Sequence, residues 1–231
     1  MDIAQIIQKK ENLIFKNYKE NFEKFRSFLL EYNKKYNLTT ILEEKDMFYK
    51  HFLDSVVGEF LFPEGAKVIE IGSGAGFPSL PIKIIRPDLS FTLVESVGKK
   101  CEFIKDFVDN FHLSNVEIYN GRAEDLAKND LYREKYDVAT ARAVARMNTL
   151  SEYCIPFIKK GGIFVAYKSG DLQEVEEAKT AYKTLGGKLK DVISYSLPYS
   201  YGDRSLVVIE KRESTPKKYP RGQGKERKDP L

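Results

Sequence analysis

Short apolar runs alternate with helical patterns through the middle of the chain, from about residue 63 to 212. Runs rich in β-branched and aromatic residues predict five strands, at residues 67–71, 91–94, 116–119, 136–139 and 163–167. Strands that alternate with helices in this rhythm favour βαβ units and therefore a parallel, doubly wound sheet. Two further runs, 192–196 and 205–210, are separated only by residues 197–204. So short a connection requires antiparallel pairing. The expected fold class is α/β, a mostly parallel seven-stranded sheet with one antiparallel strand.

The first 62 residues show a different pattern. Apolar and aromatic residues recur every three or four positions in two stripes, Tyr18, Phe22, Phe25, Leu29, Tyr32 and Tyr36, then Phe48, Phe52, Val56 and Phe60. This spacing predicts amphipathic helices whose aromatic faces belong to the core. We therefore expect an N-terminal helical cap (residues 1–62) ahead of the sheet domain (residues 63–213).

The last 18 residues carry the whole net charge of the chain. The 231 residues have a formal charge of +4, and residues 214–231 contain six Lys or Arg against two acidic residues. Rich in Pro, Gly and Lys, this tail is expected to be flexible. A cationic tail of this kind can bind RNA phosphates or can simply keep the protein soluble, and composition does not choose between them.

Several classes of protein are not expected. No apolar run is long enough for a membrane helix, and the N-terminus lacks the apolar stretch of a signal peptide. The two cysteines, Cys101 and Cys154, and the two histidines have no zinc-site spacing, so no metal is expected. These features predict a cytoplasmic protein.

The most informative motif follows the first predicted strand. Residues 70–78 read Glu-Ile-Gly-Ser-Gly-Ala-Gly-Phe-Pro and open the next predicted helix. Glycines let the backbone turn sharply and approach a ligand, and Gly72, Gly74 and Gly76 supply them here. Glu95, at the end of the second strand, is placed to accept both hydroxyls of a ribose. Together these residues predict a nucleoside site, although a glycine-rich turn without a ligand is the plainer alternative.

The spacing of the glycines bears on which nucleoside binds. Dinucleotide folds use GxGxxG, whereas this loop is GxGxG with Glu70 two residues before it. A carboxylate facing the ligand repels a pyrophosphate but tolerates a sulfonium, which favours S-adenosylmethionine over NAD. The loops after the third and fourth strands, with Ala123-Glu124 and Arg142, should reach the same edge of the sheet.

These residues resemble the glucose-inhibited division protein B (RsmG) family, methyltransferases that modify guanine N7 in 16S ribosomal RNA. The resemblance is carried by residues 70–81 together with Ile85-Arg-Pro-Asp88, Asn37-Leu-Thr39, His51-Phe-Leu-Asp-Ser55, Ser96-Val-Gly-Lys-Lys100, Ala141-Arg-Ala143, Tyr167-Lys-Ser-Gly170, residues 204–209 and residues 215–224. It covers nearly the whole chain and implies a class I S-adenosylmethionine-dependent methyltransferase fold.

The same resemblance implies specific cofactor contacts. They fall on Gly72, Phe77, Ala123, Glu124 and Arg142, with Glu95 in the ribose position. The family often has Asp where this chain has Glu70 and Glu95, which leaves the charge in place but lengthens the side chain. The implied partner is small-subunit ribosomal RNA or the 30S subunit.

No catalytic residue is expected for such a reaction. Guanine N7 has a free lone pair and no proton to remove, so positioning replaces acid–base chemistry. Cys101 and Cys154 are interpreted as packed thiols, and His51 as a helix residue hydrogen-bonded to Asp54. The candidates for RNA contact are basic residues, Lys99, Lys168, Arg204, Lys217, Lys218 and Arg221, besides Arg142. A non-catalytic RNA-binding assembly factor and a nicotinamide-dependent dehydrogenase remain as alternatives.

Overall fold

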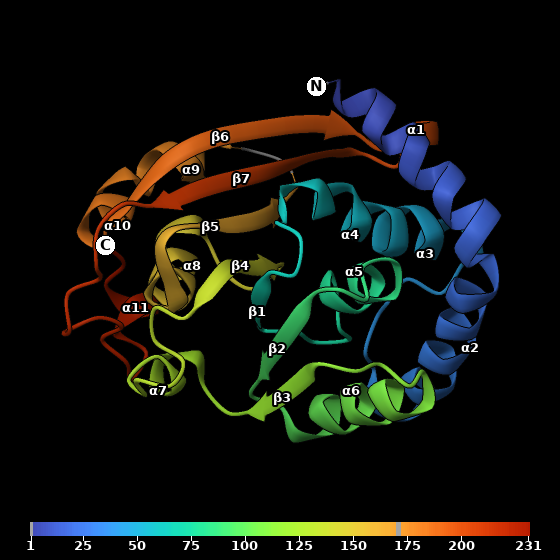
Figure 1. The fold of residues 1–231 in the computed structure, drawn as a ribbon, viewed down its shortest axis with the longest axis horizontal. Helices are drawn as coiled ribbons and strands as arrows, with labels where there is room; N and C mark the ends of the chain where they lie inside the picture. The colour runs from blue at the N-terminus through green and yellow to red at the C-terminus, as the bar shows by residue number, and fades with distance from the viewer. Residues whose placement is uncertain (1, 170–171) are drawn as a thin grey trace.

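A single seven-stranded sheet runs through the molecule (Figure 1). The computed structural model describes residues 2–169 and 172–231, so Gly170 of the predicted motif lies outside the described residues. The strand order is β3-β2-β1-β4-β5-β7-β6. The strands are β1 (Lys67–Ile71), β2 (Ser90–Glu95), β3 (Val116–Asn120), β4 (Tyr136–Arg142), β5 (Ile158–Lys168), β6 (Gly187–Ser196) and β7 (Asp203–Lys211).

The predicted strand directions are confirmed. β1 to β5 pair in parallel, and β7 lies antiparallel between β5 and β6. The turn between β6 and β7 holds a short 3₁₀ helix, η5 (Pro198–Ser200). β5 begins five residues earlier than predicted, because the glycine turn at Gly161 and Gly162 is a bulge within the strand rather than its start.

Helices cover both faces of the sheet and give two apolar clusters. Alternate side chains of one strand enter opposite clusters, as Val68 and Ile69 of β1 show. One face carries α5 (Ser79–Ile85) and α6 (Gly98–Asn110). The other face carries α7 (Ala123–Leu126), α8 (Met147–Cys154), the 3₁₀ helix η4 (Ile155–Phe157), α9 (Gln173–Glu177) and α10 (Lys179–Thr184). The sheet is thus the middle of three layers.

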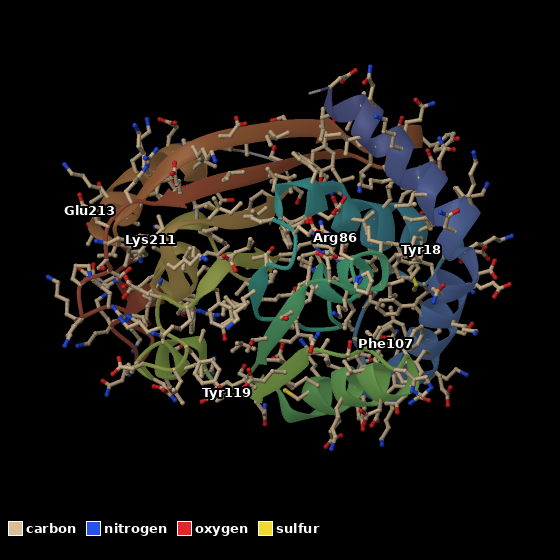
Figure 2. The ribbon with its side chains drawn as sticks, viewed as in Figure 1. Tyr18, Arg86, Phe107, Tyr119, Lys211 and Glu213 are labelled. Carbon is tan, nitrogen blue, oxygen red and sulfur yellow. The ribbon has the colours of Figure 1, made fainter. Side chains whose placement is uncertain are left out.

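The N-terminal residues are helical and lie in the core, as predicted. They form α1 (Ile3–Leu13), the π-helical segment η1 (Ile14–Tyr18), α2 (Lys19–Tyr36), α3 (Glu44–Met47), the π-helical segment η2 (Phe48–Leu53), α4 (Asp54–Val57) and the 3₁₀ helix η3 (Gly58–Leu61). Phe25 and Leu29 are fully buried in the same cluster as Val68. Arg86 (Figure 2) ties this segment to the sheet domain, because its Nη1 donates to Glu59 Oε2 at 2.8 Å. The helices therefore share the core of the sheet.

The prediction of a flexible tail is wrong for residues 214–231. Arg221 donates through Nε and Nη2 to the carboxylate of Glu152, which is fully buried on α8. Arg133 donates to the carbonyl oxygens of Thr215 and Tyr219. A short helix, α11 (Lys225–Lys228), ends the segment. The basic composition did not reveal these partners because they come from distant parts of the chain.

None of the described helices is both long and apolar enough to cross a membrane.

Candidate functional site

The glycine loop joins β1 to α5 at the carboxyl edge of the sheet. Gly72, Gly74 and Gly76 have φ values of +71°, +58° and +81°, which glycine adopts without strain. A Cβ on Gly72 would lie 2.7 Å from Val144 Cγ2, and one on Gly76 would overlap the side chain of Leu80. A Cβ on Gly74 would meet only Gly72 O, at 3.9 Å. Gly72 and Gly76 are therefore needed for packing, whereas Gly74 leaves the outer side of the loop open.

Glu95 lies against this loop, as its position after the second strand predicted. Its Oε2 accepts a hydrogen bond from Gly74 N at 2.9 Å, and its Oε1 accepts one from Val97 N at 2.8 Å. Each carboxylate oxygen keeps a further lone pair for a ligand hydroxyl. Glu95 thus fixes the open side of the loop and offers acceptors beside it.

The loop after β3 is attached to the same point. Gly121 N donates to Glu95 O at 3.0 Å, and Asn120 Nδ2 donates to the same oxygen at 3.0 Å. Ala123 is buried and Glu124 half-buried at the start of α7, directly beyond this contact. The structure therefore brings the end of β2 and the loop of Ala123 and Glu124 together.

Glu70 differs from the expectation that it faces a ligand. Its side chain is fully buried, and its Oε2 accepts from Ser79 N at 3.2 Å. Burial raises the pKa of Glu70 to about 8, so most of this carboxyl group is protonated at neutral pH. The argument that a Glu70 charge repels a pyrophosphate is therefore wrong. Of Glu70 and Glu95, only Glu95 can place a negative charge beside the loop.

Arg142, at the end of β4, connects the sheet edge to the N-terminal helices. Its Nη1 donates to Asp54 Oδ2 at 3.1 Å, and its guanidinium carbon lies 5.0 Å from the centre of the Phe77 ring. Asp54 also accepts from Tyr195 OH at 2.8 Å. Arg142 is thus held by a buried carboxylate and by the aromatic ring that follows the glycine loop.

His51 belongs to this cluster, and its predicted hydrogen bond to Asp54 is wrong. The imidazole stacks on Phe77 at 4.5 Å between ring centres, with Nδ1 3.3 Å from Arg142 Nη2 and Nε2 2.8 Å from Thr39 Oγ1. Burial, and then the charge of Arg142, lower the pKa of His51 to about 3. Because arginine only donates, neutral His51 accepts at Nδ1 and donates from Nε2 to Thr39. Helical spacing suggested Asp54 because it relates residues three or four positions apart. It cannot indicate Thr39 or Arg142, which are farther from His51 in the sequence.

Thr39, His51 and Asp54 were not predicted as site residues. All three lie in motifs that carry the family resemblance, which was the available signal, but their contacts with Arg142 and Phe77 come from tertiary structure.

The candidate RNA-binding residues fall into two groups. Lys99, Lys217 and Lys218 are exposed. The others already have partners. Lys168 Nζ donates to Ala145 O and forms an ion pair with Glu174 at 3.0 Å, and Arg204 Nη1 donates to Asp203 O. Arg221 is committed to Glu152, so the expectation that it is free for RNA is corrected.

Both cysteines are packed thiols. Cys101 and Cys154 are buried, and burial raises the pKa of each thiol, so neither is poised as a thiolate nucleophile. Among the described residues, no three His, Cys, Asp or Glu side chains group as metal ligands would.

The strand order, the antiparallel β7 and a glycine loop opposite an acidic residue define the class I methyltransferase fold. Solved structures agree. The chain matches TYW2 of M. jannaschii, solved in complex with AdoMet, with a TM-score of 0.56 and 15% identity over 75% of this chain and 80% of that one. It matches TYW2 of P. horikoshii, solved in complex with MeSAdo, with a TM-score of 0.57 and 14% identity over 74% of this chain and 64% of that one.

Sequence comparison gives the family within this fold. The model of the GidB family, rRNA small subunit methyltransferase G, matches residues 18–207. The chain is 45% identical to ribosomal RNA small subunit methyltransferase G of Lactobacillus acidophilus over 92% of this chain and 91% of that protein. It is 47% identical to that of Brevibacillus brevis over the same shares. The chain belongs to the rRNA small subunit methyltransferase G family.

Proposed function

We propose that this protein transfers a methyl group from S-adenosylmethionine to N7 of a guanine in 16S ribosomal RNA, acting in the cytoplasm on the RNA or on the 30S subunit. The observation that carries the proposal is Glu95, which is hydrogen-bonded to Gly74 on the open side of a glycine loop. The family of the chain supports the ribosomal substrate.

The residues at the loop fit an adenosyl group. The space outside Gly74 is open, and the Glu95 oxygens beside it are acceptors suited to the two ribose hydroxyls. By resemblance, the cofactor contacts are Gly72, Phe77, Ala123, Glu124 and Arg142. From their place at the sheet edge, Ala123 and Glu124 would meet the adenine, and Arg142 would meet the cofactor carboxylate or a substrate phosphate. Arg142 is held in place by Asp54 and His51.

The chemistry asks little of the protein beyond positioning. When bound, S-adenosylmethionine supplies a methyl group on a sulfonium, which is a good leaving group. Guanine N7 needs no general base, since it carries no proton at neutral pH. Neutral His51 and the Phe77 ring stack on each other beside the loop. We propose that these side chains orient the reactants and exclude water.

The exposed basic residues suit the RNA backbone. Lys99 lies in the first turn of α6, which follows Glu95, and Lys217 and Lys218 lie in the C-terminal segment. Phosphate contacts from such residues position RNA without reading its sequence.

The direct test incubates the full chain with methyl-labelled S-adenosylmethionine and unmethylated small-subunit RNA, either free or in 30S subunits, and maps the label by mass spectrometry. We expect one methylated guanine, with the methyl group on N7. Normal RNA binding with no methyl transfer to either substrate would instead support an assembly factor. Thermal stabilisation by NADH but not by S-adenosylhomocysteine would support a dehydrogenase.

A further inference from the structure

A groove lies beside the site, on the other side of η2. It has a volume of about 730 Å³ and is lined by residues of η1, α2, α3, η2 and the turn between β6 and β7. His51 of η2 stacks on Phe77 at the glycine loop, whereas Phe48 and Tyr49 of the same segment line the groove. One helical segment therefore separates the groove from the proposed methyl-transfer site.

The wall of the groove is aromatic and partly open to solvent. Phe15 stacks on Phe48 with 4.7 Å between ring centres, and Tyr49 stacks on Tyr201 at the same distance. Tyr199 contacts Tyr49 edge-on but is 77% exposed, and Phe15 is 50% exposed. Large aromatic side chains at this exposure offer free ring faces to a flat ligand.

Unusual backbone forms this wall in three places. Phe15 lies in η1 and Phe48 in η2, and both segments are π-helical. Such turns are rare and frequently occur at functional sites. Tyr199 is held with φ +56° in the β6–β7 turn, a conformation that bulky residues seldom adopt. The exposed rings therefore lie on π-helical segments and on a residue with positive φ, and not on a regular α-helix.

Arg26 of α2 adds an unsatisfied donor. It lines the groove, and its Nε is buried while no described residue accepts a hydrogen bond from it. A buried donor without a partner costs free energy, which a bound acceptor would recover. Two acids, Glu23 and Glu44, also line the groove, but so do Lys19, which forms an ion pair with Glu23 at 3.6 Å, and Lys45. The groove thus combines aromatic faces with a guanidinium suited to a phosphate.

We propose that this groove binds an unpaired base and its phosphate in single-stranded RNA, next to the guanine that is methylated. The inference rests on the proposed function, because it places a flanking nucleotide of that substrate. Base stacking on Tyr199 or Phe15 together with a phosphate on Arg26 is the usual combination for single-stranded nucleic acid. The volume falls within the range of about 300–1,000 Å³ of small-ligand sites.

The test measures binding of a single-stranded ten-residue oligouridylate that carries one 2-aminopurine, whose fluorescence falls when the base stacks. Tyr199→Ala should weaken binding roughly 5- to 150-fold and abolish the quenching. Tyr199→Phe should keep both, since the ring is retained. Arg26→Gln should lower the salt slope of binding by about 0.7, which corresponds to one lost phosphate contact.

Leu131→Ala is the matched control, because Leu131 is 79% exposed and does not line the groove. It should bind the oligonucleotide as the unsubstituted chain does. The affinity of Tyr199→Ala for S-adenosylhomocysteine and its melting temperature should also be unchanged, which separates loss of RNA binding from misfolding.

Unchanged oligonucleotide affinity and quenching in both Tyr199→Ala and Arg26→Gln would overturn the proposal. So would unchanged RNA affinity accompanied by loss of self-association in sedimentation, which would make the groove a protein interface. The proposed function is judged separately. If the unsubstituted chain transfers the methyl group and the groove variants keep its KM for RNA, only the groove proposal is refuted. If a base stacks in the groove but no methyl group is transferred, only the proposed activity is refuted.

Discussion

A carboxylate anchors each of two regions, Glu95 the glycine loop and Glu152 the C-terminal segment, yet the two regions reach their conformations in opposite ways. The loop of Gly72, Gly74 and Gly76 turns because its own residues allow positive φ, and Glu95 then fastens it from the next strand. The C-terminal segment has no comparable local pattern. It is ordered by Glu152 and Arg133, which lie on distant parts of the chain. In Figure 1 this segment lies at the opposite end of the molecule from α1 and α2.

The difference explains what each region can tolerate. A loop determined by local backbone chemistry should fail functionally when its open space is filled, while the fold survives. A segment anchored by a buried ion pair between distant residues should lose stability when that pair is broken. The four predictions below test this contrast, from the largest expected effect to the smallest.

Filling the space outside Gly74 should have the largest effect. Gly74→Glu should reduce affinity for S-adenosylhomocysteine by more than a thousandfold, about 4 kcal/mol, because the new side chain occupies the open side of the loop. The left-handed backbone should cost only about 1–2 kcal/mol of stability. Calorimetric titration and thermal melting measure the two effects.

Gly65→Glu is the control for this variant. Gly65 also has positive φ (+64°), and a Cβ there meets nothing within 4 Å, but it lies before β1 and away from the loop. It should lose similar stability and no affinity. Equal affinity in Gly74→Glu and Gly65→Glu would remove the loop from the cofactor site.

Glu70 provides a pH-dependent test of the buried layer beneath the loop. Its folded-state pKa of about 8 lies above the ordinary glutamate pKa of 4.5, so the folded state holds a proton that the unfolded state releases. The resulting stability is complete below about pH 4.5 and is lost as the pH rises through about 8. Between pH 5 and 8 the loss amounts to at most about 4 kcal/mol.

Glu70→Gln should remove this loss, because the amide cannot ionise. Denaturant titrations of both chains at several pH values measure the difference, and Glu64→Gln, at an exposed position, should behave like the unsubstituted chain. A stability–pH curve of Glu70→Gln parallel to that of the original would show that Glu70 is charged when folded.

In the C-terminal segment, Arg221→Ala should destabilise the fold. It leaves Glu152 buried without its guanidinium partner, which costs about 2–3 kcal/mol given that Arg221 is 20% exposed. The melting temperature should fall by roughly 5–10 °C. Lys217→Ala, an exposed change in the same segment, should have no such effect.

Adding Glu152→Gln to Arg221→Ala should recover part of the loss, because it removes the buried charge. If Arg221→Ala has the same melting temperature as the unsubstituted chain, this ion pair does not hold the segment, and the contrast with the loop fails.

The same contrast explains how far the sequence could be interpreted. Strand β1 was predicted to the residue, and the loop, Glu95 and the antiparallel β7 were placed correctly, because period-two patterns, glycine spacing and connection length are local signals. The burial of Glu70 was not predicted, because the sequence does not show which side chains at the end of a strand are shielded from solvent. Glu152 is 69 positions from its partner Arg221, and Arg142 is 91 positions from its partner His51. Periodicity carries no information on such pairs.

The smallest expected effect concerns the exposed lysines that the C-terminal segment keeps. Replacing Lys217 and Lys218 with Gln leaves the Arg221–Glu152 pair intact, so the fold should not change. If both contact phosphates of single-stranded RNA, the slope of log affinity against log salt should fall by about 1.4. Lys9→Gln with Lys34→Gln, exposed on α1 and α2 at the other end of the molecule, is the charge-matched control. Identical slopes in the two double variants would mean that Lys217 and Lys218 are solvated surface residues that make no phosphate contact.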